Sequence, residues 1–116
     1  MADLVKPDGG GLRYNEGKPP LELVPPEMVW AMAAVLDHGA KKYARRNWER
    51  GMSWSTVYAC LMRHVLKWFQ GEDKDAESGL PHLYHVLWNA AALVAYEARG
   101  IGEDDRPKIK KLESTT

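Results

Sequence analysis

The sequence lacks the features that would place it in a membrane or in an oxidising compartment. Its single cysteine, Cys60, cannot form an internal disulfide and has no partner at the spacing of a zinc site, so we interpret it as a small core residue. No uninterrupted apolar run approaches the ~20 residues that cross a bilayer, and the start, MADLVKPDGGG, has no cationic segment followed by an apolar one. We therefore expect a cytoplasmic protein, in the cytoplasm of a bacterial host if a phage encodes it, with no membrane partner.

The sequence also lacks an excess of charge, with 16 basic and 16 acidic side chains and a formal net charge of zero. This balance argues against bulk attraction to nucleic acid, so no stable nucleic-acid partner is expected. Locally, however, residues 38–50 carry five basic side chains and one acidic one, whereas residues 71–79 carry four acidic and one basic. Two such blocks are typical of solvated loops, but they also suit a polyphosphate bound through a metal ion.

Three segments have the three-and-four spacing of apolar residues that is typical of helices, and they span residues 26–43, 54–70 and 80–99. We predict an all-α protein, a small helical bundle with three main helices, preceded by an extended Gly/Pro-rich N-terminal segment. The predicted organisation is a flexible leader (1–10), one all-α domain (11–100) and a charged flexible tail (101–116). Within the N-terminal segment, Leu21, Leu23 and Val24 are expected to tuck against the domain. Two helices are apolar on more than one face, which favours completion of the core by a homo-oligomer.

Polar residues interrupt the third predicted helix on a single face. His82, His85 and Asn89 follow one another at steps of three and four, and His64 lies on an apolar face of the second predicted helix. A lone histidine of this kind is usually a hydrogen-bonded core residue. Three such histidines together, next to an acidic loop, favour a functional site. We therefore predict His64, His82 and His85 as catalytic residues.

The acidic loop suggests a divalent metal ion. Its carboxylates belong to Glu72, Asp73, Asp75 and Glu77, which we predict as metal ligands. Two histidines three apart with a nearby acid could hold zinc or another transition metal, with the histidines as ligands. Because oxygen ligands dominate the acidic loop, however, Mg²⁺ is favoured, with Mn²⁺ or Co²⁺ as alternatives.

Four stretches together resemble one known family. They read GLRYNEGKPPLELVPPE, GAKKYARRNWERGMSW, RHVLKWFQGED and DAESGLPHLYHVLWNAAALVAYE, and they cover about residues 11–97. The chain resembles the N-terminal domain of the phage dATP/dGTP diphosphohydrolase family, which is related to the MazG-like all-α nucleotide pyrophosphatases. The resemblance implies hydrolysis of a purine deoxynucleoside triphosphate to its monophosphate and pyrophosphate, as a supply step for a phage 2-aminoadenine nucleotide pathway.

The MazG-like motifs are altered in this sequence. Those enzymes hold magnesium with a Glu-x-x-Glu pair followed by Glu-x-x-Asp, but here the first stretch reads ACLMRHVLK and the second contains His82-x-x-His85. Either the loop acids replace the usual metal cage or the chemistry of this branch differs.

A purine deoxynucleoside triphosphate also needs contacts for its phosphates, base and sugar. Five cations are predicted to contact the phosphates, and they come first in the list below. The other five residues are predicted to contact the base, the sugar or other polar groups, and structural roles are also open to them. The predicted substrate-binding residues are Lys41, Lys42, Arg45, Arg46, Arg63, Asn89, Arg13, Asn15, Lys18 and Trp48.

Two rival interpretations come from other classes of protein. In the first, the chain is a non-enzymatic helical phage module that binds nucleic acid or a partner protein, with AKKYARR on the phosphate backbone. In the second, it is a phosphohydrolase of the HD type, but the chain contains only the dipeptide Asp37-His38 and no His-Asp.

Overall fold

The computed structural model describes residues 4–5, 11–14 and 16–108, without the side chains of the strand residues. Its helices are α1 (Pro26–Lys42), α2 (Trp54–Phe69) and α3 (His82–Arg99), with 3₁₀ turns η1 (Leu21–Leu23) and η2 (Asn47–Arg50). The all-α prediction and its three helices are confirmed. Two antiparallel two-residue strands, β1 (Leu4–Val5) and β2 (Arg13–Tyr14), were not predicted, because so short a pair has no alternating pattern.

Residues that favour helix ends set the bounds of the three helices. Pro26 occupies the first turn of α1, where its missing N–H costs the helix no hydrogen bond. Gly100 ends α3 in the left-handed conformation, with a φ of 66°, and its N–H donates to the Tyr96 carbonyl. The predicted bounds agree with the observed ones to within two residues at each end.

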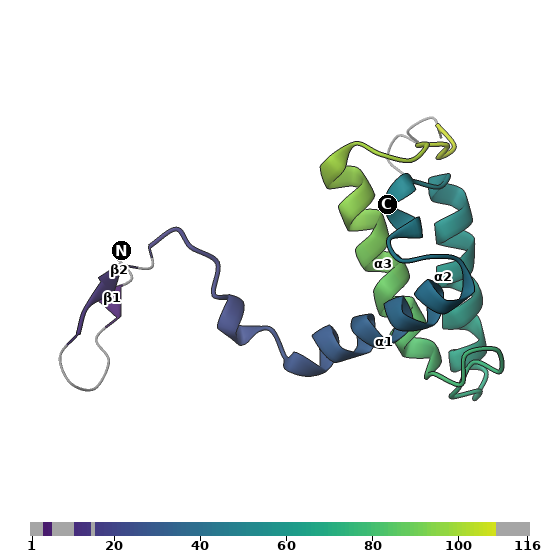
Figure 1. Cartoon of the computed structure of the whole chain (residues 1–116), viewed down its shortest axis with the longest axis horizontal. Coiled ribbons are helices and arrows are strands. Elements are labelled where there is room, and N and C mark those ends of the chain that lie inside the picture. The colour runs from purple at the N-terminus through teal and green to yellow at the C-terminus, as the bar shows by residue number, and fades with distance from the viewer. Residues whose placement is uncertain (1–3, 6–10, 15, 109–116) are drawn as a thin grey trace, which may run out of the picture.

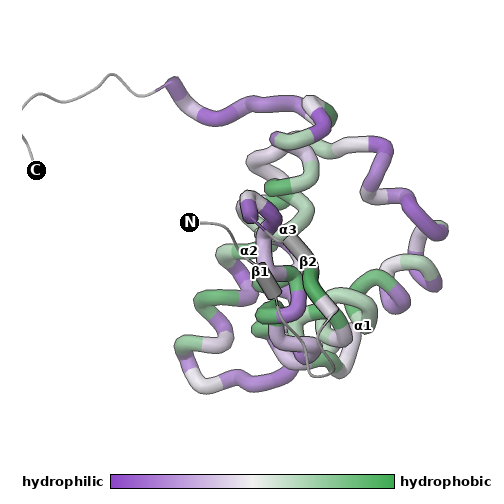
Figure 2. Tube along the Cα trace, turned by 90° about the vertical axis from the view of Figure 1, so that its left-hand side faces the viewer, coloured by the Kyte–Doolittle hydropathy of each residue, from purple (hydrophilic) through white to green (hydrophobic). Residues whose placement is uncertain are grey.

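Helix α3 is the central element, because both α1 and α2 pack against it. In Figure 1, α2 and α3 lie side by side and α1 crosses them near the start of α3. Val57 of α2 and Ala92 and Tyr96 of α3 form the buried core, which is covered by Trp48 and Trp54 among others. Figure 2 shows apolar residues concentrated in the helices and hydrophilic ones in the connections between them.

The segment before α1 extends away from the helices as an arm, which we define as residues 16–24 (Figure 1). The expectation that Leu21, Leu23 and Val24 tuck against the domain is wrong, because these side chains are 77%, 72% and 50% exposed. Two Pro-Pro pairs, at 19–20 and 25–26, flank η1. Since proline fixes φ, they restrict how the arm can bend back toward the helices.

The residues after α3 are attached to the start of α2. Trp54 N–H donates to the Glu103 carbonyl at 2.9 Å, and the Trp54 indole N–H donates to the Ile101 carbonyl at 3.1 Å. The Asp105 carboxylate accepts hydrogen bonds from both the backbone N–H and the hydroxyl of Ser55. The flexible tail was predicted from residue 101, but residues 101–105 are part of the helical body, and residues 109–116 lie outside the described chain.

Candidate functional site

The polar face of α3 is also its most buried face. His82, His85 and Asn89 are all buried, and they share this face with Ala92 and Tyr96 of the core. Among the residues that the structure describes, no buried side-chain nitrogen or oxygen lacks a hydrogen-bond partner. The polar stripe predicted from the spacing is therefore confirmed as a face, and its two histidines have partners outside α3, whereas Asn89 has one within it.

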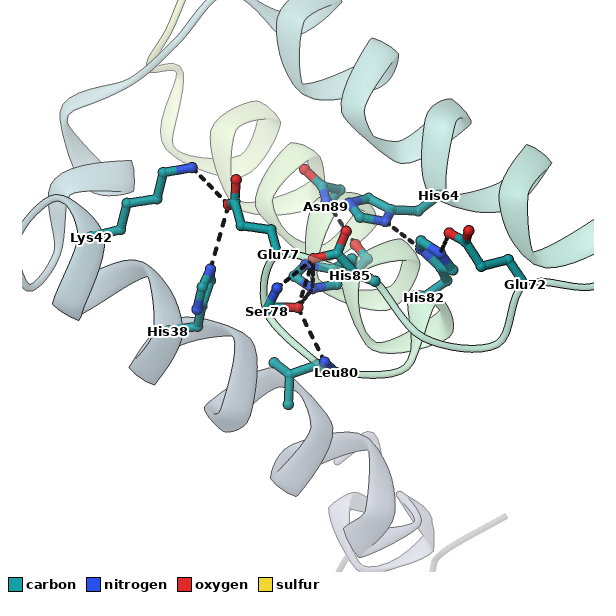
Figure 3. A network of polar contacts seen from close by, with 11 residues as sticks. His38, Lys42, His64, Glu72, Glu77, Ser78, Leu80, His82, His85 and Asn89 are labelled. Atoms are coloured by element: carbon teal, nitrogen blue, oxygen red, sulfur yellow. Dashed lines mark hydrogen bonds and ion pairs between the residues drawn. The ribbon is translucent and has the colours of Figure 1, made fainter.

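The first set of partners links α2, α3 and the connection between them. His82 Nε2 lies 2.5 Å from Glu72 Oε2, and His82 Nδ1 lies 2.8 Å from His64 Nδ1 (Figure 3). A carboxylate can only accept, so His82 Nε2 carries the hydrogen and donates to Glu72. In neutral His82, Nδ1 then presents a lone pair toward His64.

The second set of partners centres on Ser78, as Figure 3 shows. The Ser78 hydroxyl donates to Asp75 Oδ2 at 2.8 Å, and the same oxygen of Asp75 accepts the Ser78 backbone N–H at 2.8 Å. Because the hydroxyl proton is used on Asp75, His85 Nε2–H donates to Ser78 Oγ, at 2.7 Å. Asn89, one turn along α3, donates from Nδ2 to the His85 carbonyl.

The two sets meet at the His64 ring, which stacks on His85 with centroids 4.4 Å apart and an interplanar angle of 8°. Burial, aided by the neighbouring His85, lowers the pKa of His64 to about 4, and burial also lowers the pKa of His85. For Asp75, burial raises the pKa, but the Ser78 hydrogen bonds outweigh it and the pKa is lowered overall. Near neutral pH the site therefore presents two neutral imidazoles beside an ionised carboxylate.

Helix α1 closes the site from the opposite side. Lys42 Nζ lies 2.7 Å from Glu77 Oε1, and His38 Nε2 lies 3.7 Å from the same oxygen. The hydrogen bond between Lys42 and Glu77 raises the pKa of the lysine and lowers that of the glutamate. This contact connects α1 to the connection between α2 and α3.

A cleft of about 590 Å³ lies between these groups. Its wall combines neutral imidazoles, carboxylates, cations and aromatic rings, and the residues that bear these groups are His38, His64, His85, Asp75, Glu77, Lys42, Arg46, Arg63, Lys67, Trp48 and Trp88. A concave site of this volume with a few convergent polar groups is typical of small-molecule binding. The cations suit an anionic ligand and the rings suit a planar one.

The structure brings most, but not all, of the predicted site residues to this cleft. His64, His85, Asp75, Glu77, Lys42, Arg46, Arg63, Asn89 and Trp48 line it, whereas His82 and Glu72 lie behind it. Asp73 contributes its backbone carbonyl, which accepts the N–H of His82, and its side chain is exposed.

The remaining predicted contacts lie elsewhere. Lys41 pairs with Asp37 on its own helix, and Arg45 lines a different hollow beside Arg99. Lys18 is exposed on the arm. Arg13 is in β2, with no described side chain, and Asn15 lies outside the described residues.

The residues missed in the cleft or its support include Trp88, Ser78, His38 and Lys67. Ser78 follows Asp75 by three residues, a spacing at which Asp can accept hydrogen bonds in a turn. Helical spacing could have identified His38 and Lys67. His38 precedes Lys42 by four residues and Lys67 follows Arg63 by four, which puts each on the same helix face as a predicted site residue.

One group of residues in the described part of the chain is arranged so that it could share a metal ion. His64, Asp75 and His82 each offer a ligand atom, and these atoms lie within 4.8 Å of one another. Of the four predicted carboxylate ligands, this group contains Asp75 alone. In the same described part of the chain, no helix is long and apolar enough to span a membrane.

Comparison with known proteins gives two matches. Residues 8–106 match a family model described as dATP/dGTP diphosphohydrolase, N-terminal. A dATP/dGTP diphosphohydrolase of Salmonella phage PMBT28 is 37% identical over 76 residues, which make up 66% of this chain and 26% of the relative. The matched region thus spans about a quarter of that relative's length. No solved structure matches the chain.

Proposed function

The chain belongs to the dATP/dGTP diphosphohydrolase N-terminal family, and from this premise we propose that it hydrolyses purine deoxynucleoside triphosphates. In the proposed reaction, the oxygen of a water molecule forms a bond to the α-phosphorus and the bond to the α,β-bridging oxygen breaks. The products are the deoxynucleoside monophosphate and pyrophosphate. The name of the phage relative supports the class of substrate.

The observation that carries the proposal is the composition of the cleft wall. Lys42, Arg63 and Lys67 bring positive charge from α1 and α2 to the same cleft as the imidazoles. Phosphoryl transfer depends mainly on positioning and on neutralising the phosphate charge, which is the work that such cations do. Trp48 and Trp88, which also line the cleft, contribute aromatic surface that suits a purine.

His85 is the residue best suited to accept the proton of the attacking water. It lines the cleft, and its lowered pKa leaves it neutral near pH 7. Ser78 and, through it, Asp75 fix the orientation of the ring, since His85 Nε2–H donates to the serine hydroxyl. His82, by contrast, is fully buried, with both ring nitrogens engaged.

A divalent cation is part of the proposal, and it would supply Lewis-acid chemistry for cleavage of the phosphoanhydride. The donor atoms of His64, Asp75 and His82 fit such an ion in number and spacing. We also propose a supply role in a phage 2-aminoadenine nucleotide pathway. Because guanine already carries the exocyclic 2-amino group, that role requires turnover of dGTP, and a chain that hydrolyses only dATP contradicts it.

The test is hydrolysis of each common NTP and dNTP with Mg²⁺, Mn²⁺ or Co²⁺ in ¹⁸O-labelled water. Products are identified by anion-exchange chromatography and ³¹P NMR, and the position of the label is read by mass spectrometry. We expect purine deoxynucleotides to give monophosphate that carries the label and unlabelled pyrophosphate. Release of inorganic phosphate contradicts the proposal. Absence of turnover with every metal, together with salt-sensitive DNA binding, supports the non-enzymatic module.

Two adjacent lysines provide a matched pair of variants. Lys42 lines the cleft, whereas Lys41 pairs with Asp37 away from it. Loss of one charge-assisted contact costs about 1.5–3 kcal/mol, so Lys42→Ala should raise the KM for the triphosphate by roughly 10- to 100-fold. Lys41→Ala should leave KM unchanged. Equal effects of the two substitutions would show that general charge, and not the cleft, determines binding.

A further inference from the structure

Three side chains from three different segments converge on one point, and two of them line the cleft. His64 comes from α2, Asp75 from the connection that follows it, and His82 from the first turn of α3. We propose that these three side chains bind one divalent transition-metal ion. The ligand set and the class of metal follow from the geometry of the protein alone, without the proposed reaction.

The spacing of the ligand atoms suits a single ion. Metal–nitrogen and metal–oxygen bonds of about 2.0–2.2 Å put two ligand atoms of one ion roughly 3–3.5 Å apart. The two Nδ1 atoms of His64 and His82 are 2.8 Å apart, and the Asp75 oxygen completes a group within 4.8 Å. An ion bound by all three would draw the Asp75 oxygen toward the two nitrogens.

The hydrogen bond between His82 and Glu72 also favours a metal site. Glu72 fixes the hydrogen of His82 on Nε2, so that His82 Nδ1 presents its lone pair toward His64. A carboxylate that accepts the far N–H of a ligating histidine is a recurrent arrangement, because it fixes the ring and raises the basicity of the ligand nitrogen. In the metal-free chain His64 Nδ1–H therefore donates to His82 Nδ1, and metal binding would move the His64 hydrogen to Nε2, so that both lone pairs face one ion.

Asp75 is held in an equally fixed position. Its Oδ2 accepts two hydrogen bonds from Ser78, and its backbone N–H donates to the Leu80 carbonyl. His82 is fully buried, and its backbone N–H donates to the Asp73 carbonyl. The ligands are therefore preorganised by both side-chain and backbone contacts. Because His64 and Asp75 also line the cleft, further coordination positions face it.

The donor set selects the class of metal. Two imidazole nitrogens and one carboxylate suit Zn²⁺, Co²⁺ or Mn²⁺, whereas Mg²⁺ prefers an octahedral set of oxygens. The acids do not assemble an oxygen cage, because Glu72 is engaged with His82 and Glu77 with Lys42. The site therefore favours a transition metal over the Mg²⁺ expected from the acidic loop.

The test measures metal binding to the whole, metal-stripped chain without nucleotide. Calorimetric titration with Zn²⁺ or Co²⁺ should give one ion per chain, bound at least about 100-fold more tightly than Mg²⁺. The bound Co²⁺ should show visible absorption bands that differ from those of the aqueous ion. Equal affinity for Mg²⁺ and Co²⁺, or no saturable binding, overturns the inference, whereas hydrolysis with Mg²⁺ alone would leave the proposed function intact.

Conservative variants identify the ligands. His64→Gln, Asp75→Asn and His82→Gln should each weaken Co²⁺ binding by more than 10-fold, with circular dichroism as the check on folding. His38→Gln is the matched control, since His38 lines the same cleft outside the group of three. A loss of affinity as large for His38→Gln as for the others would contradict the assignment.

Glu72 positions the His82 ring, and this role can be measured separately from metal binding. Glu72→Ala should weaken Co²⁺ binding by about 10- to 100-fold. Long-range ¹H–¹⁵N NMR of the metal-free protein should show His82 protonated on Nε2 in the wild type and a mixture of tautomers in the variant. An unchanged tautomer would show that Glu72 does not orient this ring.

Discussion

Tyr96 is a fully buried core residue that carries a polar group, its hydroxyl. Its hydroxyl donates to the Trp48 carbonyl at 2.6 Å, and burial raises the pKa of the phenol. Its ring also stacks on the Trp48 ring, with an interplanar angle of 29°. One side chain of α3 thus fixes η2, and with it the aromatic wall of the cleft.

Tyr96→Phe should destabilise the protein, because it removes the donor and leaves the Trp48 carbonyl without this partner. The expected loss is about 1–2 kcal/mol in the free energy of unfolding, measured by urea denaturation. Tyr58→Phe is the control, since Tyr58 is 57% exposed. A loss no larger than that of the control would mean that water replaces the tyrosine as the donor.

Residue spacing predicts which polar side chains share a face, but not which partners satisfy them. The steps from His82 to His85 and Asn89 identify the buried stripe, because helical periodicity is local. Ser78 could not be identified as the partner of His85, because the pairing depends on how the connection after α2 folds back. That fold is set by backbone contacts, such as Gly79 N–H to the Asp75 carbonyl, that leave no pattern in the sequence.

At the scale of elements, the segment after α3 is joined to the segment before α2 by a close backbone approach. Gly102 has a φ of 77°, and a Cβ there would lie 2.5 Å from the Met52 carbonyl oxygen. A parallel bridge between Ser53 and Glu103 continues the contact. The sequence predicted a tail here because IGEDDRP is charged and aperiodic, and composition does not reveal contacts that the backbone makes.

Gly102→Ala should destabilise the protein by about 3 kcal/mol, combining the cost of a positive φ with a steric clash. Gly100→Ala is the matched control, because its φ is 66° and a Cβ there would meet nothing within 4 Å. The control should lose only about 1 kcal/mol. Thermal or urea unfolding gives both values, and equal losses would show that residues 101–105 contribute little to the stability of the helical body.

At the scale of the whole molecule, three helices leave much apolar surface uncovered. The radius of gyration is 19.0 Å, against roughly 13 Å for a compact chain of about 100 residues. Much of the uncovered apolar surface belongs to the arm and to the start of α1, since Leu21, Leu23 and Trp30 are each more than 70% exposed. A single sequence predicts that such apolar segments need a cover, but it does not show which atoms provide one, since these side chains stay exposed within the described chain.

We predict that the chain self-associates at micromolar concentration through the exposed arm, since exposed large apolar side chains such as Leu21 and Leu23 are typical of interfaces. The double substitution Leu21→Asp/Leu23→Asp should shift the assembly toward monomer in analytical ultracentrifugation. It should leave helicity unchanged, because both side chains project from the arm into solvent within one chain. Glu22→Ala, between the two leucines, should leave the assembly intact. A wild-type chain that is monomeric at tens of micromolar would contradict the prediction, and an assembly that the double variant preserves would assign the interface to another surface.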